Sequence, residues 1–159
     1  MATANFIGVA EYLHLSDKPA SEYVDGAIVS RTVPNEEHSA MQGYLIEQLR
    51  QICRNLNFLA RPELRIQTAE NRFRIPNICV RDKRTGALFL AIEILSPDDP
   101  TEIAWQKTRE YLAIGILHVW LIDPVTRTGQ IHTPERIERD KGGVLQAGEI
   151  RIDLNALSD

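Results

Sequence analysis

Apolar and polar residues alternate with two different periods along this chain, and the change of period predicts helices and strands. Over 41–56, apolar residues recur every three or four positions, which is typical of one face of a long amphipathic helix. A shorter amphipathic helix is predicted over 6–15, with Tyr12 and Leu13 facing inward. A third helix is predicted over 103–114, because a glycine follows as a stop signal.

Strand signals fill the segments between these helices. Asp25-Gly26 lies between two short β-prone runs and predicts a tight hairpin, because glycine tolerates the positive φ of a type I′ turn. The run 58–68 reads as a strand broken at Pro62, which suggests a sheet edge or a bulge. Further on, 118–122 reads as a buried strand on which 130–133 pairs back, and the tail over 144–154 offers one more short strand.

A central hairpin is predicted from 74–81 and 87–95, around the turn-like sequence at 83–86. The alternation of helices and strands along the whole chain then predicts an α/β fold, a mixed β-sheet flanked by helices.

Asn77 and Glu93 are the most informative pair in the chain, because the central hairpin would place them opposite each other. Cross-strand neighbours have Cβ atoms roughly 4.5–5.5 Å apart, so an amide oxygen and a carboxylate could share one cation. Glu93 also interrupts an apolar run, and burying an unpaired carboxylate is costly. The pair therefore predicts a metal site.

Lys107 is the third member of this predicted site. The strand after Glu93 advances roughly 10 Å at about 3.3 Å per residue. The following helix returns roughly 10 Å at about 1.5 Å per residue, which brings Lys107 level with Glu93. An ammonium there could orient a water molecule or stabilise charge on a phosphate, although a surface lysine is the simpler alternative.

The length and composition set limits on the class of protein. With 159 residues, of which 43% are hydrophobic, the chain suits one domain over residues 1–159. Its net charge of −4 argues against tight non-specific binding of nucleic acid. Cys53 and Cys79 have neither zinc-knuckle nor CxxC spacing, and no secretion signal or long apolar run is present. We therefore expect buried thiols and a cytoplasmic location.

Several sequence elements together resemble the Uma-two family of restriction endonucleases, within the PD-(D/E)xK nuclease superfamily. They include the Glu-x-Leu-Ser-Pro sequence that begins at Glu93, the lysine that follows it, and the Trp-Leu-x-Asp-Pro strand over 120–124. The likeness also covers the 22–26 hairpin and His38. It implies a restriction-endonuclease-like fold and a DNA-cleaving enzyme that uses Mg²⁺ or Mn²⁺.

The resemblance also assigns roles to particular residues. It implies that Asn77 and Glu93 bind the metal, with the backbone carbonyl of Ile94 as a further ligand. The superfamily lysine usually stands two residues after the glutamate, where this chain has a leucine, and the resemblance implies that Lys107 replaces it. Glu22 falls where the family has an acidic hairpin residue, which would complete the site; an exposed hairpin glutamate is the alternative.

Asn77 departs from this family pattern, because it stands where the family has aspartate. Asparagine keeps an oxygen acceptor but lacks the negative charge that a hard cation prefers, so metal affinity should fall. Glu63 is one substitute ligand, and a surface acid before a bend is its alternative. His38 is more typical of a surface histidine at a helix start and is not assigned to the site.

The sequence thus leaves three alternatives open. The first is a weakened metal-dependent endonuclease acting on DNA. The second is a catalytically silent relative that binds nucleic acid or protein. The third is a module for oligomerisation, in which two apolar edges, around Trp120 and in the tail, could form a homodimer.

Overall fold

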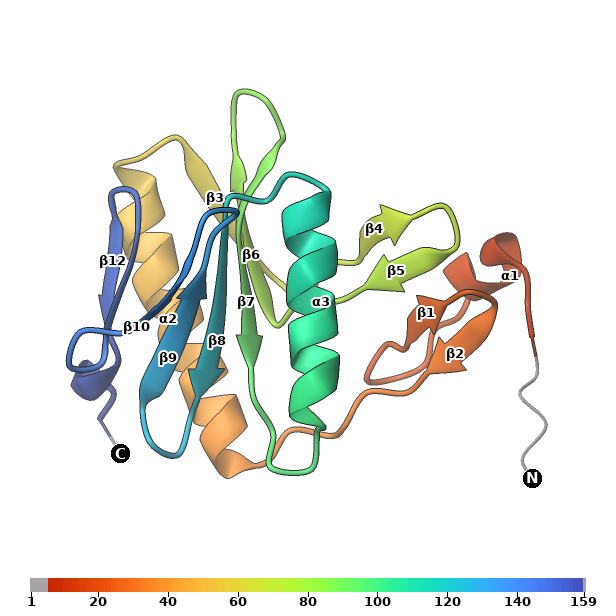
Figure 1. Ribbon diagram of the computed structural model, residues 1–159, viewed down its shortest axis with the longest axis horizontal. Coiled ribbons are helices and arrows are strands. Elements are labelled where there is room, and N and C mark those ends of the chain that lie inside the picture. Colours follow the sequence, from red (N-terminus) through yellow and green to blue (C-terminus); the bar gives the residue numbers. More distant parts are fainter. Residues whose placement is uncertain (1–5, 159) are drawn as a thin grey trace.

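The computed structural model describes residues 6–158 of the chain (Figure 1). Its helices are α1 (Val9–Leu13), α2 (Glu36–Arg54), α3 (Thr101–Ala113) and a 3₁₀ turn, η1 (Leu154–Ala156). Its strands are β1 (Glu22–Val24), β2 (Ala27–Val29), β3 (Phe58–Pro62), β4 (Ile66–Ala69), β5 (Arg72–Arg74), β6 (Ile78–Asp82), β7 (Leu88–Ile94), β8 (His118–Asp123), β9 (Thr128–His132), β10 (Ile137–Arg139), β11 (Val144–Ala147) and β12 (Ile150–Asp153).

A six-stranded mixed sheet in the order β10-β9-β8-β7-β6-β3 forms the centre of the molecule. Its only parallel pair among the described strands is β7–β8, which α3 connects; the other neighbours run antiparallel. A second sheet in the order β2-β1-β5-β4 lies beside α3, and β11 and β12 pair with each other. The prediction of a mixed sheet flanked by helices is confirmed.

The two long helices cover opposite faces of the central sheet (Figure 1). Met41, Leu45 and Leu49 of α2 are fully buried against one face, in the same apolar cluster as Ile92. Tyr111 of α3 packs in a separate cluster on the other face, with Ala91, Val119 and Leu121. Because successive strand residues point to opposite faces, Glu93 falls on the α3 side together with Ala91.

The first hairpin and the edge strand agree with their predictions. Asp25 and Gly26 both have positive φ, as a type I′ turn requires. The strand β3 ends at Pro62 and forms one edge of the central sheet, so the proline lies where no ladder hydrogen bond is lost. Cys53 and Cys79 are both free and buried, as expected.

The central hairpin is shorter than predicted. Arg74 ends β5 in the second sheet, and the hairpin begins only at Ile78 of β6. Between them, Pro76 has no N–H to donate to a ladder. The chain therefore passes from the second sheet to the central sheet just before Asn77.

Three other predictions were wrong. Leu13 is 43% exposed, because the face of α1 that packs against the aromatic cluster of the second sheet carries Val9 and Tyr12 instead. The tail forms two strands, because Gly148 has a positive φ and turns the chain back. Trp120 is fully buried in an interior strand, so no apolar edge exists there for a dimer to use.

Candidate active site

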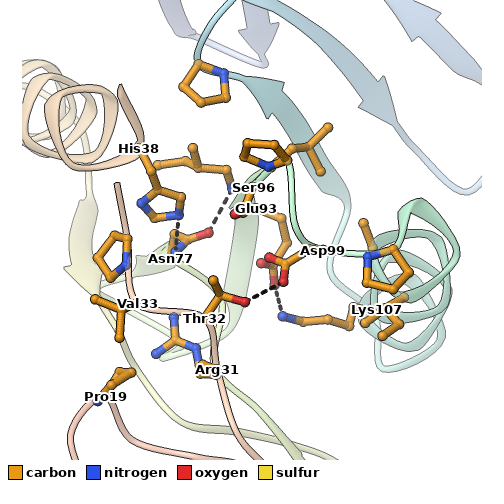
Figure 2. A pocket seen from close by; sticks show the side chains of 18 of the residues that line it. Pro19, Arg31, Thr32, Val33, His38, Asn77, Glu93, Ser96, Asp99 and Lys107 are labelled. Carbon is orange, nitrogen blue, oxygen red and sulfur yellow. Dashed lines mark hydrogen bonds and ion pairs between the residues drawn. The ribbon is translucent and has the colours of Figure 1, made fainter. Parts of the chain in front are cut away.

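Glu93 and Lys107 form a buried ion pair between the central sheet and α3. The distance from Lys107 Nζ to Glu93 Oε1 is 3.0 Å, and the two side chains are 11% and 9% exposed. Figure 2 shows the two side chains pointing toward each other across the gap between β7 and α3. The prediction that the returning helix brings Lys107 level with Glu93 is therefore confirmed.

Glu22 joins this pair from the second sheet. Lys107 Nζ lies 2.9 Å from Glu22 Oε1, so one ammonium is shared by two carboxylates. The same Glu22 oxygen accepts the backbone N–H of Ile75 at 2.9 Å, and its other oxygen lies 3.2 Å from an Arg74 guanidinium nitrogen. Glu22 is thus a buried partner of the site rather than an exposed hairpin residue.

Arg74 and Tyr111 hold the two carboxylates in place. Arg74 donates to both oxygens of Glu110 on α3, at 2.8 and 2.9 Å, and also bonds Glu22. The Tyr111 hydroxyl donates to Glu93 Oε1 at 2.6 Å. Each carboxylate therefore has a fixed position, because its partners come from rigid strands and a helix.

Burial and neighbouring charges set the protonation of these groups. Burial raises the pKa of Glu93 above its usual range, and Lys107 offsets only part of that rise. Burial alone would also raise the pKa of Glu22, but Lys107, the Ile75 N–H and Arg74 lower it below the usual value. The two carboxylates raise the pKa of Lys107 despite its burial, so the amine is charged at neutral pH.

Asn77 lies across the hairpin from Glu93, as the register of β6 and β7 predicts. The adjacent ladder pair is Ile78–Ile92, and Asn77 Oδ1 accepts the backbone N–H of Ile94 at 2.8 Å. This bond directs the Asn77 amide nitrogen toward His38 Nε2, 3.3 Å away (Figure 2). Because the amide donates, His38 Nε2 accepts, and the ring proton belongs on Nδ1.

His38 was expected at the surface, and that expectation was wrong. It lies in the first turn of α2 and is only 8% exposed, and its ring contacts the Asn77 side chain. Burial lowers the pKa of its imidazole, which favours the neutral form. His38 and Asn77 thus form a neutral amide–imidazole pair beside the buried charges.

Glu63 lies near this pair but is already engaged. It forms an ion pair with Arg31, and its Oε1 accepts from the Gln42 side chain at 2.8 Å. Its backbone has a positive φ of 54°, an uncommon conformation for glutamate. Glu63 lines the same cavity as Asn77 and His38, and Arg31 compensates its charge.

One cavity of about 750 Å³ connects these groups. Its lining includes all four predicted side chains, Glu22, Asn77, Glu93 and Lys107, together with Ile94, His38 and Glu63. A volume of this size is within the range of ligand-binding clefts. The structure thus brings every predicted site residue to one cavity.

The cavity offers oxygen donors of the kind that a divalent cation takes. Glu93 Oε2 makes no hydrogen bond to the described residues, and Asn77 Oδ1 retains a second lone pair beyond its bond to Ile94. Carboxylate, amide and carbonyl oxygens are the donors that Mg²⁺ and Mn²⁺ take. Within residues 6–158, however, no three His, Cys, Asp or Glu side chains converge as a metal-binding group.

Some members of the site were not identified from the sequence. The sequence did not single out Tyr111 for the site, and the Arg74–Glu110 pair was not foreseen. Tyr111 and Glu110 follow Lys107 by four and three positions, which places all three on neighbouring positions of one helix face. That spacing was the available signal for Tyr111 and Glu110; Arg74 comes from another sheet, and no spacing points to it.

A mixed sheet between helices, with an acid–lysine pair at the end of its central hairpin, defines a nuclease-like α/β fold. The chain belongs to the Uma2 family, described as "Putative restriction endonuclease", whose family model matches residues 9–158. The resemblance seen in the sequence is thereby confirmed. No curated protein matches the chain.

A solved structure supports the same fold assignment. It is the crystal structure of a putative nuclease belonging to DUF820 from Anabaena variabilis ATCC 29413. The two chains are 25% identical and superpose with a TM-score of 0.80, over 95% of this chain and 97% of the other. Among residues 6–158, no helix is both long and apolar enough to span a bilayer.

Proposed function

We propose that this protein is a divalent-metal-dependent endonuclease that hydrolyses DNA phosphodiester bonds, and that Asn77 weakens it. The observation that carries the proposal is the buried Glu93–Lys107 pair, 3.0 Å apart, at the base of a cavity of about 750 Å³. Membership of a restriction endonuclease family supports a nucleic-acid substrate. Buried ion pairs are costly, and a site that uses their charge is one reason to retain them.

In this proposal Glu93, Asn77 and the Ile94 carbonyl hold the metal. A bound Mg²⁺ or Mn²⁺ supplies Lewis acidity, which lowers the pKa of a coordinated water and offsets charge on the phosphate. Only one of these three ligands carries a charge, so the affinity for the cation should be low.

The protein's own side chains then orient the reactants. Lys107 places an ammonium beside Glu93, where it can position the attacking water or balance charge that builds on the phosphate. Glu22 shares that ammonium and so fixes its location. Tyr111 directs Glu93 by a 2.6 Å hydrogen bond, which leaves the other carboxylate oxygen free to act.

A plasmid-cleavage assay tests this proposal. With Mg²⁺ or Mn²⁺, the wild type should nick supercoiled DNA slowly, a chelator should stop it, and Asn77→Asp should speed it. Glu93→Gln should abolish cleavage, whereas Glu102→Gln, which alters an exposed acid in the first turn of α3, should cleave as the wild type does. Equal cleavage by the wild type and Glu93→Gln would reject the proposed centre.

The neutral Asn77 favours a second candidate function. A protein that keeps this fold but has lost its acidic ligand would bind nucleic acid or protein without cleaving. In that case the Glu93→Gln variant and the wild type would both be inert in the plasmid assay under every metal tested. Asn77→Asp would then separate a weakened enzyme from one that has lost its activity for other reasons.

A further inference from the structure

Two arginines are neighbours at one edge of the central sheet, where β3 pairs with β6 (Figure 1). Arg61 stands opposite Cys79, so Arg81 is its diagonal neighbour on the same face. The bulge lies between β6 and β7 and does not interrupt the register of β3 with β6. Burial raises the pKa of the Cys79 thiol to about 11, and the charges of Arg81 and Arg61 both oppose that rise, so both guanidinium groups lie near the thiol.

Both arginines belong to the face of the sheet that carries the proposed metal site. Ala60 and Val80 pack in the apolar cluster on the α2 side, so the residues that follow them, Arg61 and Arg81, point to the α3 side. Asn77 shares this face with Arg81, because the orientation repeats at every second residue. Four residues at about 3.3 Å each separate the two positions by about 13 Å. A row of polar side chains therefore runs from Asn77 along β6 toward the hairpin turn.

The positive charges of this row are not compensated by the protein. Five other arginines of residues 6–158 each pair with a carboxylate: Arg31, Arg72, Arg74, Arg84 and Arg136. Within the same residues, Arg61 donates only to the Ala60 carbonyl, at 3.1 Å, and Arg81 Nε is buried with no acceptor. Like charges at neighbouring positions of a sheet repel each other. An anion bound between the two guanidinium groups would offset that repulsion.

The geometry favours a phosphodiester backbone as this anion. A guanidinium presents a planar fork of N–H donors that matches the oxygens of a phosphate. Neither Arg61 nor Arg81 lines the cavity, so a molecule that reaches them from Glu93 must be extended. At an axial rise of about 3.4 Å for each nucleotide, about 13 Å corresponds to about four nucleotides of one DNA strand. Repeated phosphates along such a strand can meet both arginines.

We propose that Arg61 and Arg81 bind backbone phosphates of DNA, and that the bound strand runs along β6 from Glu93 toward the hairpin turn. The end of the path at Glu93 rests on the proposed function, whereas the contacts of the two arginines with phosphate do not. The net charge of the chain is −4 and only two uncompensated cations lie on the path. Binding is therefore weak and falls steeply as salt rises.

The salt dependence of DNA binding tests this path. Fluorescence anisotropy with a short labelled duplex, in the presence of a chelator, gives the slope of log affinity against log salt concentration. Each phosphate contact contributes about 0.9 to that slope, so the double variant Arg61→Gln, Arg81→Gln should lower it by about 1.8 and weaken binding. An unchanged slope, or a wild type that binds no DNA at low salt, would overturn the proposal.

Two further double variants separate the charges from the fold. Arg61→Lys, Arg81→Lys keeps both charges and should keep the slope of the wild type. Lys141→Gln, Arg151→Gln removes two charges at exposed positions outside the cavity and should also keep it. A slope that falls in the lysine variant, or equally in the control, would contradict a charge contact at Arg61 and Arg81.

A competitor of another class tests whether the anion is a phosphate. Polyglutamate at equal concentration of charge should displace less labelled DNA than unlabelled duplex does, because the spacing of its carboxylates differs from that of backbone phosphates. Equal displacement would overturn the proposal and assign the surface to an acidic protein segment.

The two proposals fail in different ways. If the slope depends on Arg61 and Arg81 but the plasmid assay does not depend on Glu93, the phosphate contacts stand and the nuclease proposal falls. If cleavage depends on Glu93 but the slope is the same without the two arginines, the nuclease proposal stands and the path along β6 falls.

Discussion

The two sides of the cavity differ in how their polar groups are satisfied. On the α3 side, the buried carboxylates of Glu22 and Glu93 share one ammonium, that of Lys107. On the α2 side, Asn77 and His38 meet through a hydrogen bond between neutral groups. We refer to these as the charged half and the neutral half. In the proposed nuclease the charged half supplies the acid and the lysine, whereas the neutral half lacks one ligand charge.

A neutral side chain at position 77 therefore leaves the hydrogen bonding of the site intact. The Ile94 N–H fixes Asn77 Oδ1, and His38 accepts from the amide nitrogen, so the amide leaves no unpaired buried atom of its own. An aspartate would keep the first bond and place a second oxygen where the amide nitrogen now lies. One substitution would thus supply the acidic ligand that the proposed metal site lacks, provided that the His38 ring proton moves to Nε2 to face the new oxygen.

The largest expected effect comes from breaking the charged half. Lys107→Met should lower the free energy of unfolding by about 3 kcal/mol, because it leaves two buried carboxylates without their shared cation. Urea unfolding followed by circular dichroism measures this, with Lys141→Met at an exposed lysine as the control. Adding Glu22→Gln to Lys107→Met should recover part of the loss; no recovery would show that the two groups are not coupled.

Breaking the neutral half should cost less. His38→Ala removes a buried ring and leaves the Asn77 amide nitrogen without its acceptor, for a loss of about 2 kcal/mol in the free energy of unfolding. The same urea experiment applies, and His14→Ala serves as the control, because His14 is exposed and bonds only within its own helical turn. A loss larger than that of Lys107→Met would reverse the ranking of the two halves.

The smallest effect is a pH-dependent one at Glu110, which supports the charged half through Arg74. Burial alone would raise the pKa of Glu110, but Arg74 and Thr68 hold it below the usual value near 4.5. A lowered folded-state pKa contributes stability above pH 4.5 that is lost as the pH falls through the folded-state value. Glu110→Gln should therefore cost about 1 kcal/mol at neutral pH and little in strong acid.

Urea unfolding at a series of pH values follows this dependence. The difference in unfolding free energy between the wild type and Glu110→Gln should shrink steadily as the pH falls below 4.5, the usual pKa of a glutamate carboxyl. Glu102→Gln, at an exposed acid of the same helix, should give no such trend. A difference that stays constant with pH would mean that Glu110 acts by packing and not by charge.

The charged half could be predicted from the sequence because regular geometry determines it. The rises of a strand and of a returning helix place Lys107 level with Glu93 without any knowledge of other contacts. Glu22 entered only through the family resemblance, since it comes from another sheet. Arg74 was out of reach for the same reason: its partners Glu22 and Glu110 are far from it in sequence, and no local period links them.

The neutral half shows where such prediction ends. The opposition of Asn77 and Glu93 follows from hairpin register, but the direction of the Asn77 amide depends on one backbone bond to Ile94. The burial of His38 depends on where the first turn of α2 meets the end of β7. Trp120 was placed at an edge because the pattern of one strand does not reveal how many strands lie beyond it. In the structure β9 and β10 lie beyond β8, the strand that carries Trp120.

Mn²⁺ binding tests the proposed metal site itself, measured by electron paramagnetic resonance for the wild type, Asn77→Asp and Glu93→Gln. Asn57→Asp, at an exposed asparagine, controls for the added charge. We expect Asn77→Asp to bind Mn²⁺ about tenfold more tightly than the wild type, and Glu93→Gln to remove binding in either background. Equal affinity of the wild type and Asn77→Asp, or undiminished binding by Glu93→Gln, would contradict the proposed metal site.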